Sequence, residues 1–307
     1  MKYILLMVLG ICLITPLSAQ KTFDLITLTG RYGSPQPYNS VYEDKATEYA
    51  TTLSLTVPPI NLSEKLTWYN SVNHFYWHVS NNETMPEGIS NPININGFIL
   101  RTGLIKSFSR DREIQMIFVP RLMSDLKNID ADHFQFGGIA MFKQKYSNKL
   151  TMSYGAMYNQ ELFGPYLVPL INLYWQISDR WSISGLLPVD SKIKYDVNDQ
   201  FNLGIGHFGL ITSYKLGAPE NSGDYMERQS IDVTMFARHK IVGNFYLEGR
   251  FGYTFGRTYA QYAADQKVDF SIPLVGFGDD RVQKNVSFQD GWIAQLRLVY
   301  NVPIPGS

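Results

Sequence analysis

The segment WIAQLRLVYNV, residues 292–302, alternates side chains of opposite character with a period of two. Trp292 and Leu296 fall on one face, whereas Gln295 and Arg297 fall on the other. Successive side chains of a β-strand point to opposite sides of a sheet, so this pattern predicts a strand with one apolar and one polar face. A full charge lies near the middle of the polar face.

The same alternation recurs along the chain, and it appears again in 113–122, 192–197, 231–238 and 245–255. A soluble two-sheet protein also alternates, so the period alone leaves that architecture open. The sense of the alternation is more informative: the polar faces carry charges in mid-strand, and the apolar faces are long and end in aromatic residues. This arrangement is typical of strands with lipid outside and a polar lumen inside. A closed barrel is the form in which strands satisfy every backbone group in lipid.

Two kinds of connection separate these segments. Short turns rich in Ser, Asn, Asp and Gly, which favour tight hairpins, occur at 62–66, 108–112, 146–150, 177–181, 197–201 and 241–245. Longer connections are expected at 34–45, 81–95, 124–131, 161–165, 187–191, 217–228 and 262–288. Six short and seven long connections join fourteen antiparallel strands in an all-β, up-and-down transmembrane barrel. Twelve strands remain possible if 23–33 and one weakly patterned segment stay outside the sheet.

The tryptophans support the same frame. Trp68 and Trp181 follow short turns, Trp175 precedes one, and Trp292 and Trp77 lie near the opposite strand ends. Indole rings collect at membrane–water interfaces because one edge is apolar and the other polar. We therefore expect all five rings in the two interfacial belts.

The first residues have the pattern of a secretory signal peptide. Lys2 precedes an apolar run over 3–14, and small residues end the segment before Gln20. We expect a signal peptide at 1–19 and a barrel domain at 20–307; an N-terminal anchor is the alternative. The only cysteine, Cys12, lies in the signal segment, so we expect neither a disulfide nor a thiolate-bound metal in the barrel. Without Lys2, 26 basic residues face 27 acidic ones, and no basic face for a nucleic acid is expected.

A search for catalytic chemistry gives no positive signal. His74 and His78 share a strand face, but four residues of strand span about 13 Å, too far for one metal ion. No G-x-S-x-G nucleophile elbow occurs. We expect no enzyme, no metal site and no cofactor.

The informative residues are charges on the polar strand faces. The candidates for lining a lumen are Arg101, Glu113, Arg121, Asp232, Arg238, Glu248, Arg250 and Arg297. They could ring an open pore and select solutes by charge, or pair with one another and constrict the interior. We favour the constricted interior because the charges nearly cancel. The longest connection, 262–288, could fold inward as a plug or remain on the surface.

The chain resembles the uncharacterised outer-membrane β-barrel families common in Gram-negative bacteria of the Bacteroidota. The resemblance rests on the signal segment, on turns such as 177–181, and on Gly185-Leu186-Leu187-Pro188 before Lys192-Ile193-Lys194-Tyr195. It covers most of the mature chain and implies an outer-membrane location, but no activity and no site residues. It departs at the C-terminus, where 303–307 replace the terminal aromatic that many such barrels present for assembly; Tyr300 is the substitute we expect.

These observations favour a porin-like passive channel or small-solute transporter. The alternatives are a closed barrel for structure or surface interaction, a carrier for hydrophobic molecules, and, least favoured, a membrane-embedded hydrolase. The expected partners are outer-membrane lipids, the barrel-assembly machinery and small solutes.

Overall fold

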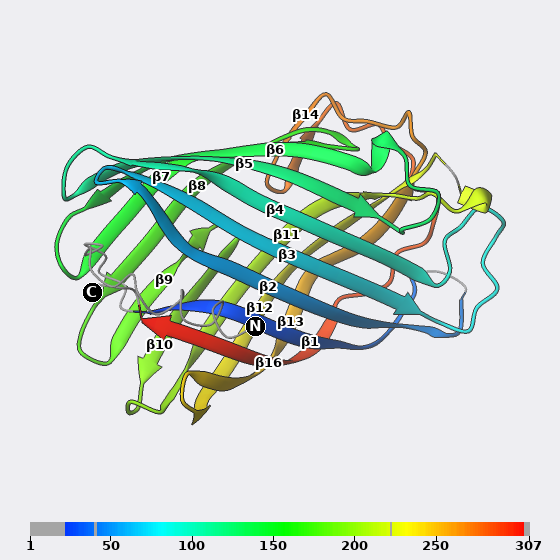
Figure 1. The fold of residues 1–307 in the computed structure, drawn as a ribbon. Coiled ribbons are helices and arrows are strands. Elements are labelled where there is room, and N and C mark those ends of the chain that lie inside the picture. The colour runs from blue at the N-terminus through cyan, green and yellow to red at the C-terminus, as the bar shows by residue number, and fades with distance from the viewer. Residues whose placement is uncertain (1–21, 40–41, 222, 304–307) are drawn as a thin grey trace, which may run out of the picture.

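The computed structural model describes residues 22–39, 42–221 and 223–303. The predicted signal peptide and residues 304–307 lie outside this part of the chain. Sixteen strands form one sheet, of which β14 (Phe270–Ile272) and β15 (Val275–Phe277) are a small hairpin beside a ring of fourteen. The ring closes because β1 (Thr22–Pro37) pairs with both β2 (Lys45–Ser63) and β16 (Gly291–Pro303). The prediction of an antiparallel fourteen-stranded barrel is confirmed (Figure 1).

The other wall strands are β3 (Leu66–Ser80), β4 (Ile93–Ser107), β5 (Arg112–Ser124), β6 (Phe134–Lys145), β7 (Leu150–Glu161), β8 (Gly164–Gln176), β9 (Trp181–Leu187), β10 (Asp190–Asp196), β11 (Phe201–Lys215), β12 (Tyr225–Val242) and β13 (Phe245–Tyr262). Two short 3₁₀ turns, η1 (Ala131–His133) and η2 (Pro219–Asn221), lie between strands. No helix in the described ranges has the length and apolar character needed to cross a membrane.

The six short turns lie at one end of the barrel, which we call the short-turn end. Four of them are built alike: the amides of Phe108, Tyr146, Ile177 and Val197 each donate to the carbonyl four residues later. The second residue of each turn, a Ser or Asn, also accepts a hydrogen bond from the amide two residues on. The repeated Ser/Asn motif is therefore a local hydrogen-bonding device that reverses the chain.

Connections at the opposite end, the loop end, differ from the predicted lengths. The connections expected at 161–165 and 187–191 are both tight, with only 162–163 and 188–189 outside strands. The first of these errors has a physical source, because Gly164 adopts a positive φ angle, which is typical of a loop residue, at the first position of β8. Strands β9 and β10 are short as well, and their turn does not reach the loop end.

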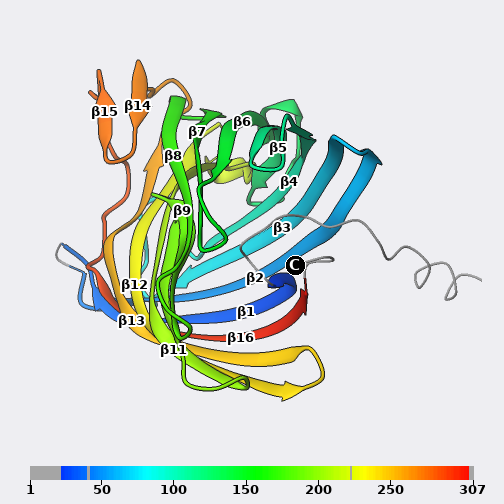
Figure 2. The ribbon, with the colours of Figure 1, turned by 90° about the vertical axis from the view of Figure 1, so that its left-hand side faces the viewer.

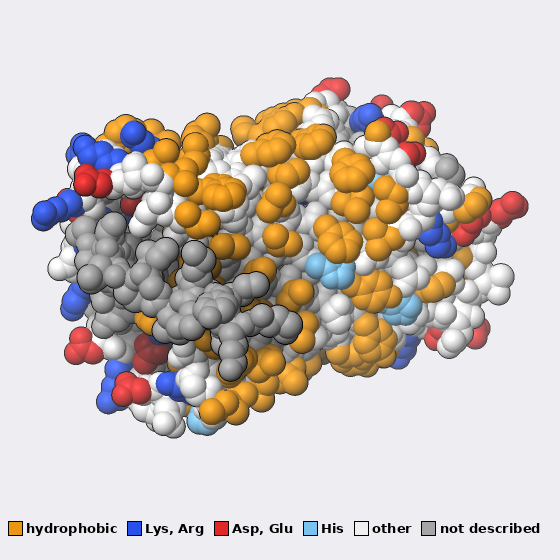
Figure 3. All heavy atoms as spheres, in the orientation of Figure 1, with side chains coloured by type: hydrophobic (Ala, Val, Ile, Leu, Met, Phe, Trp, Pro, Cys, Tyr) orange, Lys and Arg blue, Asp and Glu red, His pale blue; other side chains and the backbone are white. Residues whose placement is uncertain are grey.

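The outer wall is apolar. Met235, Leu296 and Phe118 are 65%, 57% and 52% exposed, and they belong to the alternating faces that the sequence predicts. Figure 3 shows apolar side chains over the middle of one wall, with charged side chains towards the two ends. Burying such a surface in lipid is favourable, since each Å² of apolar area removed from water contributes about 25 cal/mol.

The prediction for Trp77 is wrong. Its side chain is 3% exposed and points into the barrel, whereas Trp68, Trp175, Trp181 and Trp292 lie on the outer surface. The prediction fails because both faces of β3 carry aromatic residues, so the sequence does not mark which face is outward.

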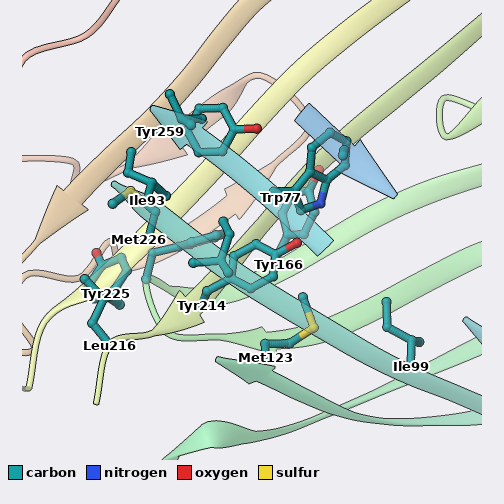
Figure 4. Close-up of a cluster of buried hydrophobic side chains, with 14 of the residues drawn as sticks. Trp77, Ile93, Ile99, Met123, Tyr166, Tyr214, Leu216, Tyr225, Met226 and Tyr259 are labelled. Carbon is teal, nitrogen blue, oxygen red and sulfur yellow. The ribbon is translucent and has the colours of Figure 1, made fainter. Parts of the chain in front are cut away.

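An apolar cluster fills the loop half of the interior. Trp77, Met123, Tyr214, Met226 and Tyr259 are among its members, each at most 3% exposed (Figure 4). Strand β11 crosses to the far wall at this level and forms a parallel bridge with β5, in which the Asp125 amide donates to the Lys215 carbonyl at 3.1 Å. The interior is therefore occupied by side chains and backbone at the loop end.

Candidate functional site

The short-turn half of the interior contains a cavity of about 730 Å³. Its lining extends from Asp24 and Gln115, near the short-turn end, to Trp77 at the base of the apolar cluster. The charged side chains in the lining are Arg31, Arg101, Lys192, Arg250 and Arg297, against Asp24, Asp190 and Asp232. Five cationic side chains thus face three acidic ones.

One carboxylate organises the wall of this cavity. Glu248 accepts hydrogen bonds from Arg238 Nε at 2.7 Å, from Arg250 Nε at 2.6 Å and from Arg297 Nη1. The sheet register produces this arrangement, since Arg238 and Arg297 are the direct cross-strand partners of Glu248. Asp24 accepts two further bonds from Arg238, at 2.7 and 3.1 Å. Three guanidinium groups share two carboxylates, so the network keeps an excess of positive charge.

A second ionic network lies deeper, at the level of the apolar cluster. Glu48, fully buried, accepts hydrogen bonds from Arg31 and, at 2.8 Å, from the Tyr259 hydroxyl. Arg31 also donates to Asp232. Arg228 donates to the Tyr259 hydroxyl at 3.0 Å, and its guanidinium carbon lies 3.4 Å from the centre of the Trp77 ring.

This contact is a buried cation–π interaction. Strands β12 and β3, which carry Arg228 and Trp77, lie five steps apart around the ring of fourteen, so their contact spans the bore. Together with Glu48 and Tyr259, these side chains form what we call the ceiling of the cavity.

A third polar group fixes β11 where it crosses the barrel. The buried carboxylate of Glu161 accepts from the Ser213 amide at 2.9 Å, from the Ser213 hydroxyl at 2.7 Å and from Arg121 at 2.9 Å. Gln135 donates to the Ser213 carbonyl at 3.0 Å. These side chains satisfy the edge of β11 in place of a neighbouring strand, as buried backbone groups require.

The predicted charges have separate placements. Asp232 and Arg250 line the cavity, as do Arg101, which donates to Asn73, and Arg297. Arg238 and Glu248 form the wall network. Arg121 binds Glu161, the carboxylate that fixes β11 where it crosses the barrel. Glu113 pairs with Lys143 at 3.1 Å and is one-quarter exposed.

Several charged residues of the interior escaped sequence reasoning. Arg31 could have been found, because it falls on the same strand face as Thr27 and Thr29 in an alternating segment. Arg228 could not, because the sequence assigned it to the loop 217–228, whereas β12 begins at Tyr225. Glu161 was missed in the same way, as a residue expected in a connection.

The described residues contain no side-chain cluster suited to a metal ion. In the described ranges, no three His, Cys, Asp or Glu side chains converge on a point that could hold an ion. His74 stacks on Phe98 with ring centroids 4.3 Å apart, and His78 bonds to Asn94 at 2.7 Å.

A closed antiparallel wall with an apolar outer face and a charged interior defines the class of this protein, a transmembrane β-barrel of the outer-membrane type. The chain belongs to the family described as "Domain of unknown function (DUF6268)", whose model matches residues 43–270. A comparison with curated proteins gives no match.

Solved structures with a similar architecture are themselves outer-membrane barrels. A COG4313 outer membrane channel from Pseudomonas putida F1 is 10% identical, with a TM-score of 0.47 over 94% of this chain and 97% of that chain. The NanC porin is 9% identical, with a TM-score of 0.37 over 90% and 98%. The translocator domain of the autotransporter NalP from Neisseria meningitidis is 10% identical, with a TM-score of 0.36 over 91% and 88%. These likenesses are too low to transfer any property of those proteins.

Proposed function

We propose that this protein is a constricted channel of the bacterial outer membrane that lets small anionic solutes pass. The observation that carries the proposal is the cavity of about 730 Å³, whose lining has five basic and three acidic side chains. The apolar belt supports the location, since outer-membrane lipid is the environment in which a wall of exposed Leu, Phe and Met is stable.

The charge pattern supports anions over cations. Arg238, Arg250 and Arg297 share Glu248, and Lys192 lines the same cavity without an ion-pair partner within the described residues. A surplus of fixed positive charge lowers the energy of an anion in a narrow space and raises that of a cation. The cavity size fits a small molecule, because ligand pockets commonly measure about 300–1,000 Å³.

The ceiling supports a constricted channel rather than a wide pore. Arg228, Trp77, Glu48 and Tyr259 meet across the interior and are each at most 3% exposed. Interior charges that are paired in this way close space, whereas an open porin keeps its lumen charges in water. We expect a small unit conductance.

The test is a reversal-potential measurement on purified protein in planar bilayers under a tenfold KCl gradient. We expect a current that reverses on the anion-selective side. The matched variant Arg297→Gln should bring the reversal potential closer to zero, and Lys143→Gln, which changes a paired charge outside the cavity lining, should not. A cation-selective current, or no current in repeated insertions verified by gel migration, would contradict the proposal.

A further inference from the structure

The barrel wall has a gap in its backbone pairing between β8 and β11. The short strands β9 and β10 pair with β8 only over 171–176 and with β11 only over 202–208. Above them, residues 164–170 of β8 and 209–215 of β11 have no ladder between them. At about 3.3 Å per residue, this lateral gap is roughly 20 Å high.

The sequence of β8 is suited to a free edge. Pro165 and Pro169 lie in the unpaired stretch, and the Pro165 carbonyl accepts a bond from Ser271, on the side away from β7. Pro165 and Pro169 are four residues apart, so their backbone nitrogens point to the same side of the strand, which is the side that faces the gap. Both positions therefore lack an amide hydrogen there. Proline is tolerated in strands where its missing amide faces no partner. This edge is therefore built without a neighbouring wall strand.

Strands β13 and β16 also differ in length, but there another segment fills the free edge. Strand β13 also extends beyond its partner β16, but the segment 284–290 lines its edge with backbone bonds, such as Lys284 N to Gln261 O at 2.9 Å. Asn285 adds bonds to the Gln261 amide and the Tyr259 carbonyl. That space is filled as a strand would fill it.

The β8–β11 gap is covered instead by a strap, residues 263–281, which contains the β14–β15 hairpin. The strap touches the β7–β8 turn through Val268 N to Phe163 O at 2.8 Å, and it touches the top of β8 through the bridge of Ser271 with Tyr166. Arg281 ties its end to Glu227 on β12 at 2.6 Å and to Asp279 at 2.8 Å. In Figure 2 the hairpin stands beside the top of β8. Of the two placements that the sequence leaves open for 262–288, an inward plug or a surface position, this part of the loop takes the surface position, with Leu274 and Phe277 exposed.

Aliphatic side chains separate the cavity from the strap. Leu186 and Val189, at the tip of the β9–β10 hairpin, line the cavity. A hollow of about 140 Å³ lies behind the strap, where Ile211 and Tyr166 meet the charged side chains of Glu227, Asp279 and Arg281. Leu167 and Leu187, on the outer face beside the gap, are exposed by 36% and 40%. Moving such side chains breaks no backbone ladder, whereas any other exit through the wall would.

We propose that the lumen opens sideways through this gap, and that the solutes using it are small amphipathic anions that leave towards lipid beneath the strap. The proposal rests on the proposed channel function and names its route and solute class. The apolar gap accepts a hydrocarbon portion, and the basic cavity accepts an acidic group. The loop-end mouth is not the route, because the ceiling and the crossing of β11 occupy it.

Two engineered disulfides distinguish the routes. The pair Tyr166→Cys and Ser271→Cys links the strap to β8. The pair Tyr38→Cys and Phe288→Cys links two directly bridged residues at the loop-end mouth. Apart from Cys12, the chain has no cysteine. Bridged partners lie within the range that a disulfide spans. Each variant is its own control in reductant, which separates the effect of the cross-link from the loss of the aromatic side chains.

The assay is the swelling rate of proteoliposomes in iso-osmotic sodium pentanesulfonate, a permanently charged amphipathic anion, or sodium methanesulfonate. We expect the strap disulfide to slow pentanesulfonate entry by about tenfold, a barrier of about 1.4 kcal/mol, with recovery in reductant and little change from the mouth disulfide. Slowing by the mouth disulfide alone, or equal rates with and without a verified strap disulfide, would overturn the lateral route. Absence of swelling for the unmodified protein with both salts would instead contradict the channel itself.

Discussion

The two halves of the lumen use the same side-chain types in opposite ways. In the short-turn half, Glu248 holds three arginines along one wall and leaves a cavity in front of them. In the loop half, Glu48 lies with Arg31 and Arg228 among Trp77, Tyr214 and Tyr259, and all of these are buried. The difference is the neighbours, because aromatic side chains surround the second network, whereas Arg250 and Arg297 of the first stay 15% and 18% exposed beside the cavity.

The comparison teaches that counting charges on lumen faces does not show whether a barrel is open. A paired charge beside a cavity attracts a solute, whereas the same pair among aromatic rings narrows the bore and depends on its carboxylate for its stability.

Removing the acid of the closed half should have the largest effect. Glu48→Gln leaves Arg228 buried without a carboxylate and Arg31 with Asp232 alone, so we expect a loss of about 3–5 kcal/mol in unfolding free energy. Urea-induced unfolding in lipid vesicles measures it. The control is Glu113→Gln, whose partly exposed pair with Lys143 should contribute only about 0–1 kcal/mol. Similar losses for both variants would erase the distinction between the halves.

The second largest effect on stability should come from Glu161, which fixes β11 where it crosses the barrel. Glu161→Gln keeps one acceptor oxygen for Ser213 but loses the charge that binds Arg121, and hydrogen bonds to charged groups contribute about 1.5–3 kcal/mol. We expect a destabilisation of about 2 kcal/mol together with faster hydrogen exchange at Ser213. Unchanged exchange there would mean that β11 is held by other contacts.

Within the open half, charge should alter selectivity and not folding. Lys192→Gln removes a cation from the cavity lining, so we expect the anion-to-cation permeability ratio to fall by about threefold. The unfolding midpoint should stay near that of the parent protein. A large loss of stability would show that Lys192 serves the wall network instead.

The smallest effect concerns acid pH at the strap. Arg281 donates to the Asp279 carboxylate and holds the pKa of that carboxyl below its ordinary value of 3.8. A lowered pKa means that the stabilisation is present above pH 3.8 and is lost as the pH falls through the folded-state value. We expect lower hydrogen-exchange protection at Val268 below pH 3.8 than at pH 5, and no such difference in Asp279→Asn. A pH response that persists in the variant would exclude this carboxyl as its source.

The fold was accessible from sequence because its signals are local. Alternation over 245–255 and 292–302 and the Ser/Asn turn motif act within a few residues, so the strand number follows from them, as does the facing of the strands that alternate clearly. The wall network was accessible for the same reason, since Arg238, Glu248 and Arg297 are cross-strand neighbours in register.

The rest depends on contacts between distant segments. Arg228 meets Trp77 across the bore, and Glu161 meets Ser213 across the crossing of β11. Neither contact leaves a periodic trace in the sequence. The lengths of β9 and β10, which create the lateral gap, depend on the two-residue turn at 188–189, which the sequence places in a longer connection at 187–191.

Thiol accessibility of two serines tests most directly whether the lumen is divided into an open and a closed half. Ser54 lines the cavity, and Ser230, fully buried, faces the interior above Asp232; Ser→Cys is nearly isosteric at both positions. We expect a charged, water-soluble thiosulfonate to modify Ser54→Cys rapidly in proteoliposomes and to leave Ser230→Cys unmodified. Equal modification of the two cysteines would contradict it.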